Sequence, residues 1–228
     1  MGEPLQIDVL TVFPGMLRGF LEESMLRRAA RQGAVVFRTV DLRDFARDAR
    51  RTADDRPYGG GPGMIMKPEL WFEAIEAVRT PGARVILMTP SGVTFRQAEA
   101  RRLAKARHLI FVCGHYEGID DRVRAALVTD ELSIGDYVLT NGVLPAAVVV
   151  DAVVRLLPGV LGGGEAATRD ESFSEVRLEY PQYTRPPVYR GMAVPAVLQN
   201  GNHAEVEAWR ERQALDRTAK RRPDLLVR

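Results

Sequence analysis

The stretch His108-Leu109-Ile110-Phe111-Val112-Cys113-Gly114 decides the fold class, because it is a short apolar strand that ends in a glycine. A second run of this kind, Arg84-Val85-Ile86-Leu87-Met88, precedes it along the chain. Short, nearly continuous apolar runs are typical of strands that a parallel sheet buries on both faces. Residues 5–12, 34–40 and 132–134 predict three further strands.

The intervals between these strands carry apolar residues at helical spacing. The expected helices cover residues 15–31, 68–78, 94–106, 119–127 and 144–157. Residues 41–63 have no apolar period and end in a run of glycines, which predicts a long loop. Because strands alternate with helices, the sequence predicts an α/β fold with a mostly parallel sheet.

A change in composition divides the chain. Residues 158–171 are rich in glycine and polar residues and predict a linker, and residues 181–187 are too dense in proline for regular structure. Residues 203–219 then predict an amphipathic helix with a basic end. We expect one domain at residues 1–160, a flexible linker at 161–175 and a small helical domain at 176–228.

Length and composition exclude several classes of protein. The chain has 228 residues, 46% of them hydrophobic and 27% charged, which is typical of a globular protein. It has no apolar run of about 18 residues and no basic and apolar start of the secretory kind, so we expect a cytoplasmic location and no membrane partner. Cys113 is the only cysteine, which excludes an intramolecular disulfide and a zinc site of several cysteines. The three histidines are too scattered to predict a metal site.

The formal net charge of +2 is compatible with a nucleic-acid partner but does not require one. Arginines crowd residues 27–51 and the last dozen residues. Arginine makes forked contacts with phosphate, although codon bias in a GC-rich genome explains the choice of arginine equally well.

Three loops with unusual composition follow three of the expected strands, at residues 89–92, 114–120 and 134–142. Each mixes glycines, which let a ligand approach the backbone, with polar or aromatic side chains. Ligands of open parallel sheets bind beyond the carboxyl ends of the strands, so we expect these loops to form one pocket. The alternative is that they are ordinary turns. No P-loop, dinucleotide fingerprint or Gly-x-Ser-x-Gly motif is present.

Charged residues stand out at two further places. Asp170 and Glu171 lie next to Ser172-Phe173 in the expected linker, where paired acids are usually solvated. Arg155 lies in a very apolar helix, and such a charge needs an ion-pair partner, an exposed position or a function.

Six motifs, in order along nearly the whole chain, are similar to those of one family. They lie at residues 54–64, 112–120, 133–139, 158–162, 183–186 and 201–205. The chain resembles the bacterial tRNA (guanine-37-N1)-methyltransferases, the TrmD family of the SPOUT superfamily. The resemblance implies an α/β fold with a deep trefoil knot, S-adenosyl-L-methionine as methyl donor, and a homodimer. It also implies that the acceptor is N1 of the tRNA guanosine 3′ of the anticodon, so the expected partners are tRNA and a second copy of the chain, with no DNA.

The resemblance also implies roles for residues. It assigns the donor to Thr89, Pro90, Gly114, Tyr116, Glu117, Gly118, Ile134, Gly135, Asp136, Tyr137, Val138, Leu139, Gly142 and Pro145. It assigns RNA contacts to Asp54, Arg56, His115, Arg185 and His203. Asp54 or nearby loop residues are expected to read the guanine edge, because a carboxylate accepts from its N1 and N2 hydrogens.

The chemistry needs a base, because N1 of guanine carries a proton, and a cation to stabilise charge at O6. The family's arginine corresponds to Arg155. Its base corresponds to Asp170 when residues are counted from Arg155, and to Glu171 when they are counted from Ser172-Phe173, with a slight preference for Asp170. The sequence leaves open whether a divalent ion such as Mg2+ assists.

Two alternatives stand beside this reading. One is a SPOUT methyltransferase that acts on a different RNA nucleoside or on ribose, which the motifs at residues 56–64 and 183–186 argue against. The other is an RNA-binding protein that has lost catalysis, which the presence of Arg155, Asp170 and Glu171 argues against.

Overall fold

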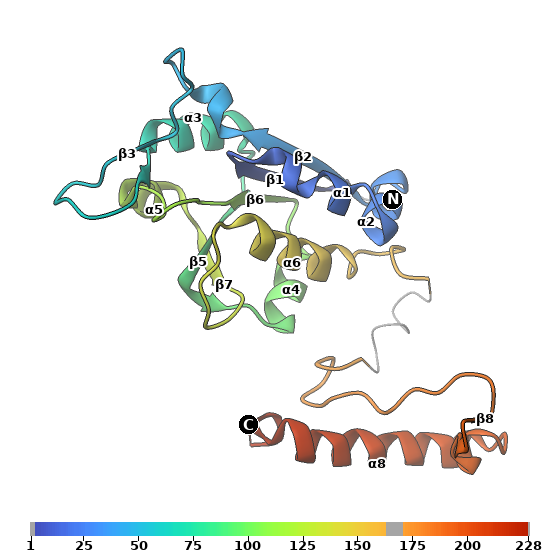
Figure 1. The fold of residues 1–228 in the computed structure, drawn as a ribbon. Coiled ribbons are helices and arrows are strands. Elements are labelled where there is room, and N and C mark those ends of the chain that lie inside the picture. The colour runs from blue at the N-terminus through green and yellow to red at the C-terminus, as the bar shows by residue number, and fades with distance from the viewer. Residues whose placement is uncertain (1–2, 163–170, 228) are drawn as a thin grey trace. The chain divides into compact units, whose positions relative to one another are not determined.

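The computed structural model describes residues 3–162 and 171–227. The chain divides into two compact units, one ending at Gly162 and the other beginning at Gly163 (Figure 1). Asp170, one of the two expected bases, lies outside the described residues.

A five-stranded sheet forms the centre of the N-terminal unit. Its strands are β1 (Leu5–Thr11), β2 (Val35–Asp41), β5 (Arg84–Thr94), β6 (His108–Val112) and β7 (Asp130–Ser133). They lie in the order β2-β1-β6-β5-β7, and every neighbouring pair is parallel. The expected α/β fold with a mostly parallel sheet is therefore confirmed.

Helices cover both faces of this sheet (Figure 1). They are α1 (Arg18–Leu21), α2 (Ser24–Arg31), α3 (Pro68–Val78), α4 (Gln97–Leu103), α5 (Asp121–Leu127) and α6 (Val143–Val154). One apolar cluster joins α2, α4 and α6 to Ile86 and Phe111, and the other joins α3 and α5 to Val85 and Ile110. Successive strand residues thus enter opposite clusters, which explains the continuous apolar runs.

The single helix expected at residues 15–31 is wrong. The chain instead forms a 3-10 turn (Pro14–Leu17), α1 and α2, with a break at Glu22 and Glu23. Leu17 and Leu26 are both buried in the same cluster. At about 100° per residue an unbroken helix would place these two residues on opposite faces, so the break lets both reach the core.

Two other expectations need correction. The strand expected to end at Met88 continues to Thr94, and residues 89–92 form an excursion within it, because Met88 and Val93 are both in register with Leu132. The long loop expected at 41–63 contains a 3-10 turn (Leu42–Phe45) and the two-residue strand β3 (Asp54–Asp55), which pairs antiparallel with β4 (Ile65–Met66).

A buried polar group lies between three strands of the sheet. Asp8 is fully buried on β1 and accepts hydrogen bonds from both Nε and Nη2 of Arg38, at 2.8 and 2.6 Å. Its Oδ2, which accepts from Nη2 of Arg38, also lies 2.8 Å from Nε2 of His108, whose Nδ1 is 2.8 Å from the hydroxyl of Thr80. Both oxygens of the buried carboxylate therefore have polar partners, as such a group requires.

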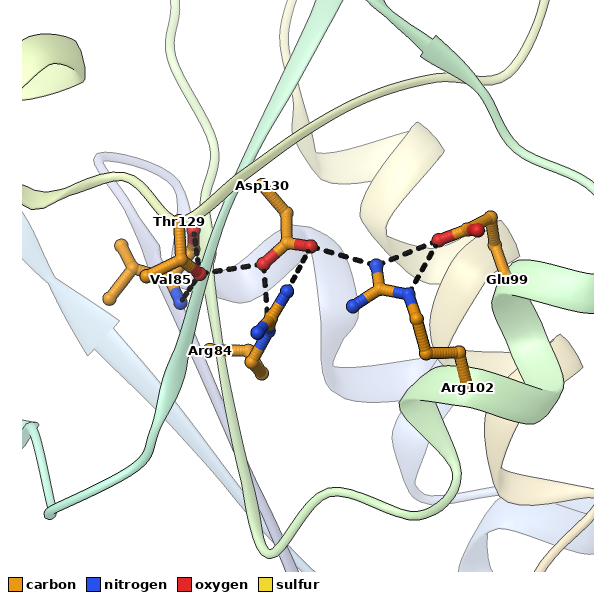
Figure 2. A network of polar contacts seen from close by, with 6 residues as sticks. All are labelled: Arg84, Val85, Glu99, Arg102, Thr129 and Asp130. Carbon is orange, nitrogen blue, oxygen red and sulfur yellow. Dashed lines mark hydrogen bonds and ion pairs between the residues drawn. The ribbon is translucent and has the colours of Figure 1, made fainter.

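Asp130 holds a second network, at the start of β7. Its carboxylate accepts from Arg84 at 2.9 and 2.7 Å, from Arg102 at 2.7 Å and from the Thr129 hydroxyl at 2.6 Å. Figure 2 shows Asp130 between the two guanidinium groups, with Glu99 beyond Arg102. Burial alone would raise the pKa of Asp130, but these hydrogen bonds outweigh it and hold the pKa below its usual value.

The C-terminal unit is built around one long helix, α8 (His203–Arg221), close to the bounds expected from the sequence. The side chain of Asn202 caps its start by accepting from the backbone N–H of Glu205. Thr218 is buried, donates to the carbonyl of Ala214 and accepts from the N–H of Leu178, which ties the preceding segment to the helix.

The same unit contains a hairpin that the sequence did not predict. Its strands are β8 (Val188–Tyr189) and β9 (Met192–Ala193), and 3-10 turns follow at Ala196–Leu198 and Pro223–Leu225. In the parts of the chain that the structure describes, no helix is both long enough and apolar enough to cross a membrane.

We expect Asp130→Asn to lower the free energy of unfolding by about 1–3 kcal/mol at neutral pH, because both arginines lose a charged acceptor. The pKa is lower in the folded than in the unfolded protein, so the carboxylate stabilises the fold above its ordinary pKa and this contribution is lost as the pH falls through the folded value. The deficit of the variant should therefore shrink below about pH 5.

Urea unfolding at stepped pH measures this deficit. Glu76→Gln, at an exposed position on α3, is the matched control and should stay near wild type. A deficit that stayed constant into the acid range would contradict the role given to the Asp130 charge.

Candidate active site

The three loops singled out in the sequence line one cavity of about 410 Å³ at the carboxyl ends of the strands. The excursion of β5 contributes Thr89, Pro90 and Ser91, and the other two loops follow β6 and β7. The three loops therefore lie together, as expected, whereas the alternative that they are ordinary turns without a ligand is not tested by the cavity alone. This cavity lies where open parallel sheets bind their ligands.

Two of the loops are held together through glycine. The N–H of Gly142 donates to the carbonyl of Gly114 at 2.9 Å, and His115 and Asn141 form an isolated antiparallel bridge. A Cβ atom at Gly142 would lie 2.8 Å from the Cα of Cys113, so no larger residue fits without moving backbone. The Asn141 side chain accepts from the N–H of Val143, where α6 begins.

A third contact anchors the loop after β6 to the segment around β4. The N–H of Glu117 donates to the carbonyl of Met64 at 3.1 Å, and the N–H of Met66 donates to the carbonyl of Gly118 at 3.0 Å. Tyr116 has a φ of +59°, an uncommon value for a residue with a side chain. The surrounding hydrogen bonds hold this strained conformation, and such strain is found at functional sites.

His115 presents an unsatisfied polar atom in the wall of the cavity. Its ring packs edge-on between Phe13 and Tyr116, with centroids 4.9 and 4.8 Å away, and its backbone N–H donates to the sulfur of Met66. Its Nδ1 is buried and has no hydrogen-bond partner among residues 3–162 and 171–227. A buried polar atom of this kind needs a partner, and a ligand can supply it.

Asp54, an expected reader of guanine, interacts with Tyr116. Burial, the negative charge of Asp54 and a hydrogen bond between the two side chains together raise the pKa of the Tyr116 hydroxyl. Tyr116 thus stays protonated at neutral pH. Behind the pocket, burial raises the pKa of the Cys113 thiol far above its usual value, so this thiol also stays protonated.

Every residue that we assigned to the donor lines this cavity, with the exception of Asp136. Ser91, Thr140 and Asn141 also line the cavity, and they lie within the three loops expected to form it, although no donor contact was assigned to them. The structure adds Leu132 and Ser133, at the end of β7, which the sequence reasoning missed.

The remaining expected residues lie elsewhere. Arg155 is half-buried at the C-terminal end of α6. Arg56 is exposed in the loop after β3. Glu171, Arg185 and His203 belong to the C-terminal unit. Among the residues that the structure describes, no three His, Cys, Asp or Glu side chains gather in a way that could hold a metal ion.

A cavity built from glycine-containing loops at the carboxyl end of a parallel sheet is the place where α/β proteins bind small molecules. A family model described as tRNA (Guanine-1)-methyltransferase TrmD matches residues 5–228. The chain belongs to this family.

Individual relatives agree. The tRNA (guanine-N(1)-)-methyltransferase of Geobacillus kaustophilus is 56% identical over 224 residues, which cover 97% of this chain and 91% of that protein. The protein of the same name from Moorella thermoacetica is 55% identical over 231 residues, covering 98% and 91%. That of Lacticaseibacillus paracasei is 56% identical over 225 residues, covering 97% and 87%.

We expect Gly142→Ala to push apart the two loops that meet at Cys113. The added methyl group meets backbone rather than a flexible side chain, so we expect a loss of about 1–3 kcal/mol in the free energy of unfolding. Hydrogen exchange should speed up in peptides spanning 113–118 and 134–142. Gly19→Ala is the control, because a Cβ there meets nothing within 4 Å. Unchanged exchange in both peptides would refute the close approach.

Proposed function

We propose that this chain transfers the methyl group of S-adenosyl-L-methionine to N1 of guanosine 37, the nucleotide 3′ of the anticodon in tRNA. Membership of the family supports the class of reaction. The observation that carries the proposal is the single cavity around which the expected donor residues gather, all except Asp136.

The cavity fits the proposed donor. Its volume of about 410 Å³ is within the roughly 300–1,000 Å³ of small-molecule sites. Gly114 and Gly118 leave backbone groups accessible, Ile134 and Leu139 offer apolar contact, and Nδ1 of His115 is an unused polar atom. When bound, S-adenosyl-L-methionine supplies a methyl group on a positively charged sulfur.

A carboxylate next to the Ser172-Phe173 pair is the proposed base. It takes the N1 proton of guanine, the N1 lone pair forms the new bond to the methyl carbon, and the sulfur keeps the electrons of the bond that breaks. Glu171 begins a tight turn, since its carbonyl accepts from both the N–H and the hydroxyl of Ser174. We propose Asp170 as the base, with Glu171 as the alternative, and Arg155 as the cation that stabilises negative charge on O6.

The proposal includes a homodimer. Leu144 and Val148 lie one turn apart on α6, and their side chains are 55% and 49% exposed. Met16 and Phe20 add further exposed apolar surface on the neighbouring 3-10 turn and α1. Exposed apolar surface of this kind is typical of a protein interface, and a second copy of the chain is the proposed occupant.

We also propose that residues 1–160 form the knotted, donor-binding domain, that 161–175 link it to residues 176–228, and that the latter bind tRNA in the cytoplasm. The knot is proposed on membership of the family alone. Arg56, Arg185 and His203 are exposed and available to phosphates. Binding through such contacts weakens as salt rises.

Methyl transfer from labelled S-adenosyl-L-methionine to a tRNA transcript with guanosine 37 tests the function. A transcript with adenosine 37 is the control, and we expect label in the first alone. Running the assay with Mg2+ and with EDTA answers the question about a divalent ion. Donor binding without transfer to either transcript would favour a non-catalytic RNA-binding protein or another RNA substrate.

Asparagine or glutamine at the proposed base should remove proton transfer while donor affinity persists. We expect Asp170→Asn to lower kcat by about 10²- to 10⁴-fold, and Glu171→Gln to have a much smaller effect. Glu175→Gln is the control, because Glu175 pairs with Arg177 in the same segment. If Glu171→Gln lowered kcat far more than Asp170→Asn, Glu171 would be the base.

Arg155→Ala should lower kcat by about 10²- to 10³-fold, because the charge that develops on O6 loses its cation. The dissociation constant of the donor, measured by calorimetry, should change little. Arg107→Ala is the control, since the Arg107 side chain is 90% exposed and its ion pair with Glu3 is long, at 3.7 Å. A loss of donor binding in Arg155→Ala would assign Arg155 a structural role instead.

A further inference from the structure

We propose that the C-terminal unit binds one unpaired nucleobase of the RNA substrate in a cavity of its own. This cavity has a volume of about 640 Å³, and its walls include Tyr180, Tyr183, Arg185, Trp209 and Arg210. All its lining residues belong to the C-terminal unit, whereas the donor cavity belongs to the N-terminal unit. The choice of RNA as the ligand rests on the proposed function.

Aromatic rings form two sides of the cavity. The rings of Tyr183 and Trp209 are tilted by 53° with centroids 6.4 Å apart, so they do not stack on each other. Trp209 projects from α8 on the same side as Val206, one turn earlier, and Tyr183 lies in the proline-dense segment before the hairpin. Aromatic faces of this kind bind nucleobases by stacking, whatever the base.

Arg210 gives the cavity a directional hydrogen-bond donor. Its guanidinium lies 4.8 Å from the centroid of the Tyr180 ring, which holds the group in place. Its Nε is buried and has no hydrogen-bond partner among the described residues. Its Nη1 reaches Glu207 only at 3.9 Å, and that carboxylate is exposed. The fork therefore retains donors for an acceptor, such as the O6 and N7 edge of guanine.

The charges that line the cavity favour a nucleic acid over an apolar peptide. Arg185 and Arg210 are the charged lining residues in the described part of the chain, and no carboxylate lines the cavity. A base can stack on the aromatic rings inside the cavity while the two guanidinium groups attract the negatively charged phosphate of the same nucleotide, which stays outside the cavity. A paired base hides its faces within the helical stack, so an unpaired base is the ligand that this geometry selects.

Tryptophan fluorescence tests the proposal in the full chain, because the protein has only two tryptophans. Trp71 is fully buried in the N-terminal unit and gives a constant background. We expect a tRNA transcript to quench the emission of Trp209 and to shield it from iodide, and a fully paired RNA duplex of the same length to do neither. Trp209→Phe should abolish the signal.

Variants of the cavity give a second, kinetic readout. Tyr183→Ala should raise the KM for tRNA by about tenfold, within the roughly 5- to 150-fold expected for one stacked base, while kcat and the dissociation constant of S-adenosyl-L-methionine stay unchanged. Tyr189→Ala is the control, because Tyr189 is a 57% exposed tyrosine of the same segment outside the cavity.

Arg210→Lys keeps the positive charge but removes the forked hydrogen-bond donors of the guanidinium, so it should also raise the KM for tRNA. Arg212→Lys, on the exposed side of α8, is its control and should leave KM unchanged.

Two results would overturn the inference. One is an unchanged KM and an unchanged quench in Tyr183→Ala and Arg210→Lys. The other is a Trp209 that iodide cannot reach in the RNA-free protein, because a covered cavity has no room for a base. In both cases methyl transfer to the guanosine 37 transcript would still stand. Quenching of Trp209 without any methyl transfer would refute the proposed function, but it would still support base binding in this cavity.

Discussion

The contact between Gly142 and Cys113 is the constraint on which the candidate site depends. Only a residue without a side chain allows the segment before α6 to lie against the end of β6. This approach brings the loops that follow β6 and β7 to one cavity, and it sets the point at which α6 begins, because Asn141 both pairs with His115 and caps Val143. The apolar strands supply the rigid platform, and the glycine allows their loops to converge.

Much of this architecture was predictable, because burial on both faces leaves a plain signal in a strand. The runs at 84–88 and 108–113 were assigned to the correct strands for this reason. The break at Glu22 and Glu23 was not predictable, since helical spacing within each half of residues 15–31 is normal and only the shared core demands the break. The hairpin of β8 and β9 was not predictable either, because two-residue strands next to prolines carry no periodic pattern.

The candidate site, like the fold, could be predicted from the sequence only in part. Position at the carboxyl end of a strand was sufficient to predict which loops would meet, and the family resemblance supplied the chemistry. The sequence did not predict that Asp136 would be absent from the cavity lining while Ser133 belongs to it, because side-chain direction follows from backbone angles that spacing does not encode. It also gave no sign that Nδ1 of His115 and Nε of Arg210 would be buried without partners among the described residues.

The excursion within β5 has a consequence for how such a site can change over generations. Surface loops generally tolerate insertions, because the entropy of closing them grows slowly with length. This one begins and ends at the same partner, since Met88 and Val93 are both in register with Leu132. A residue added between them leaves the pairing on either side unchanged, whereas Gly92 packs against the backbone of Glu131 and leaves no room for a side chain. This wall of the cavity can therefore vary in length and in most of its side chains over generations, but not at Gly92.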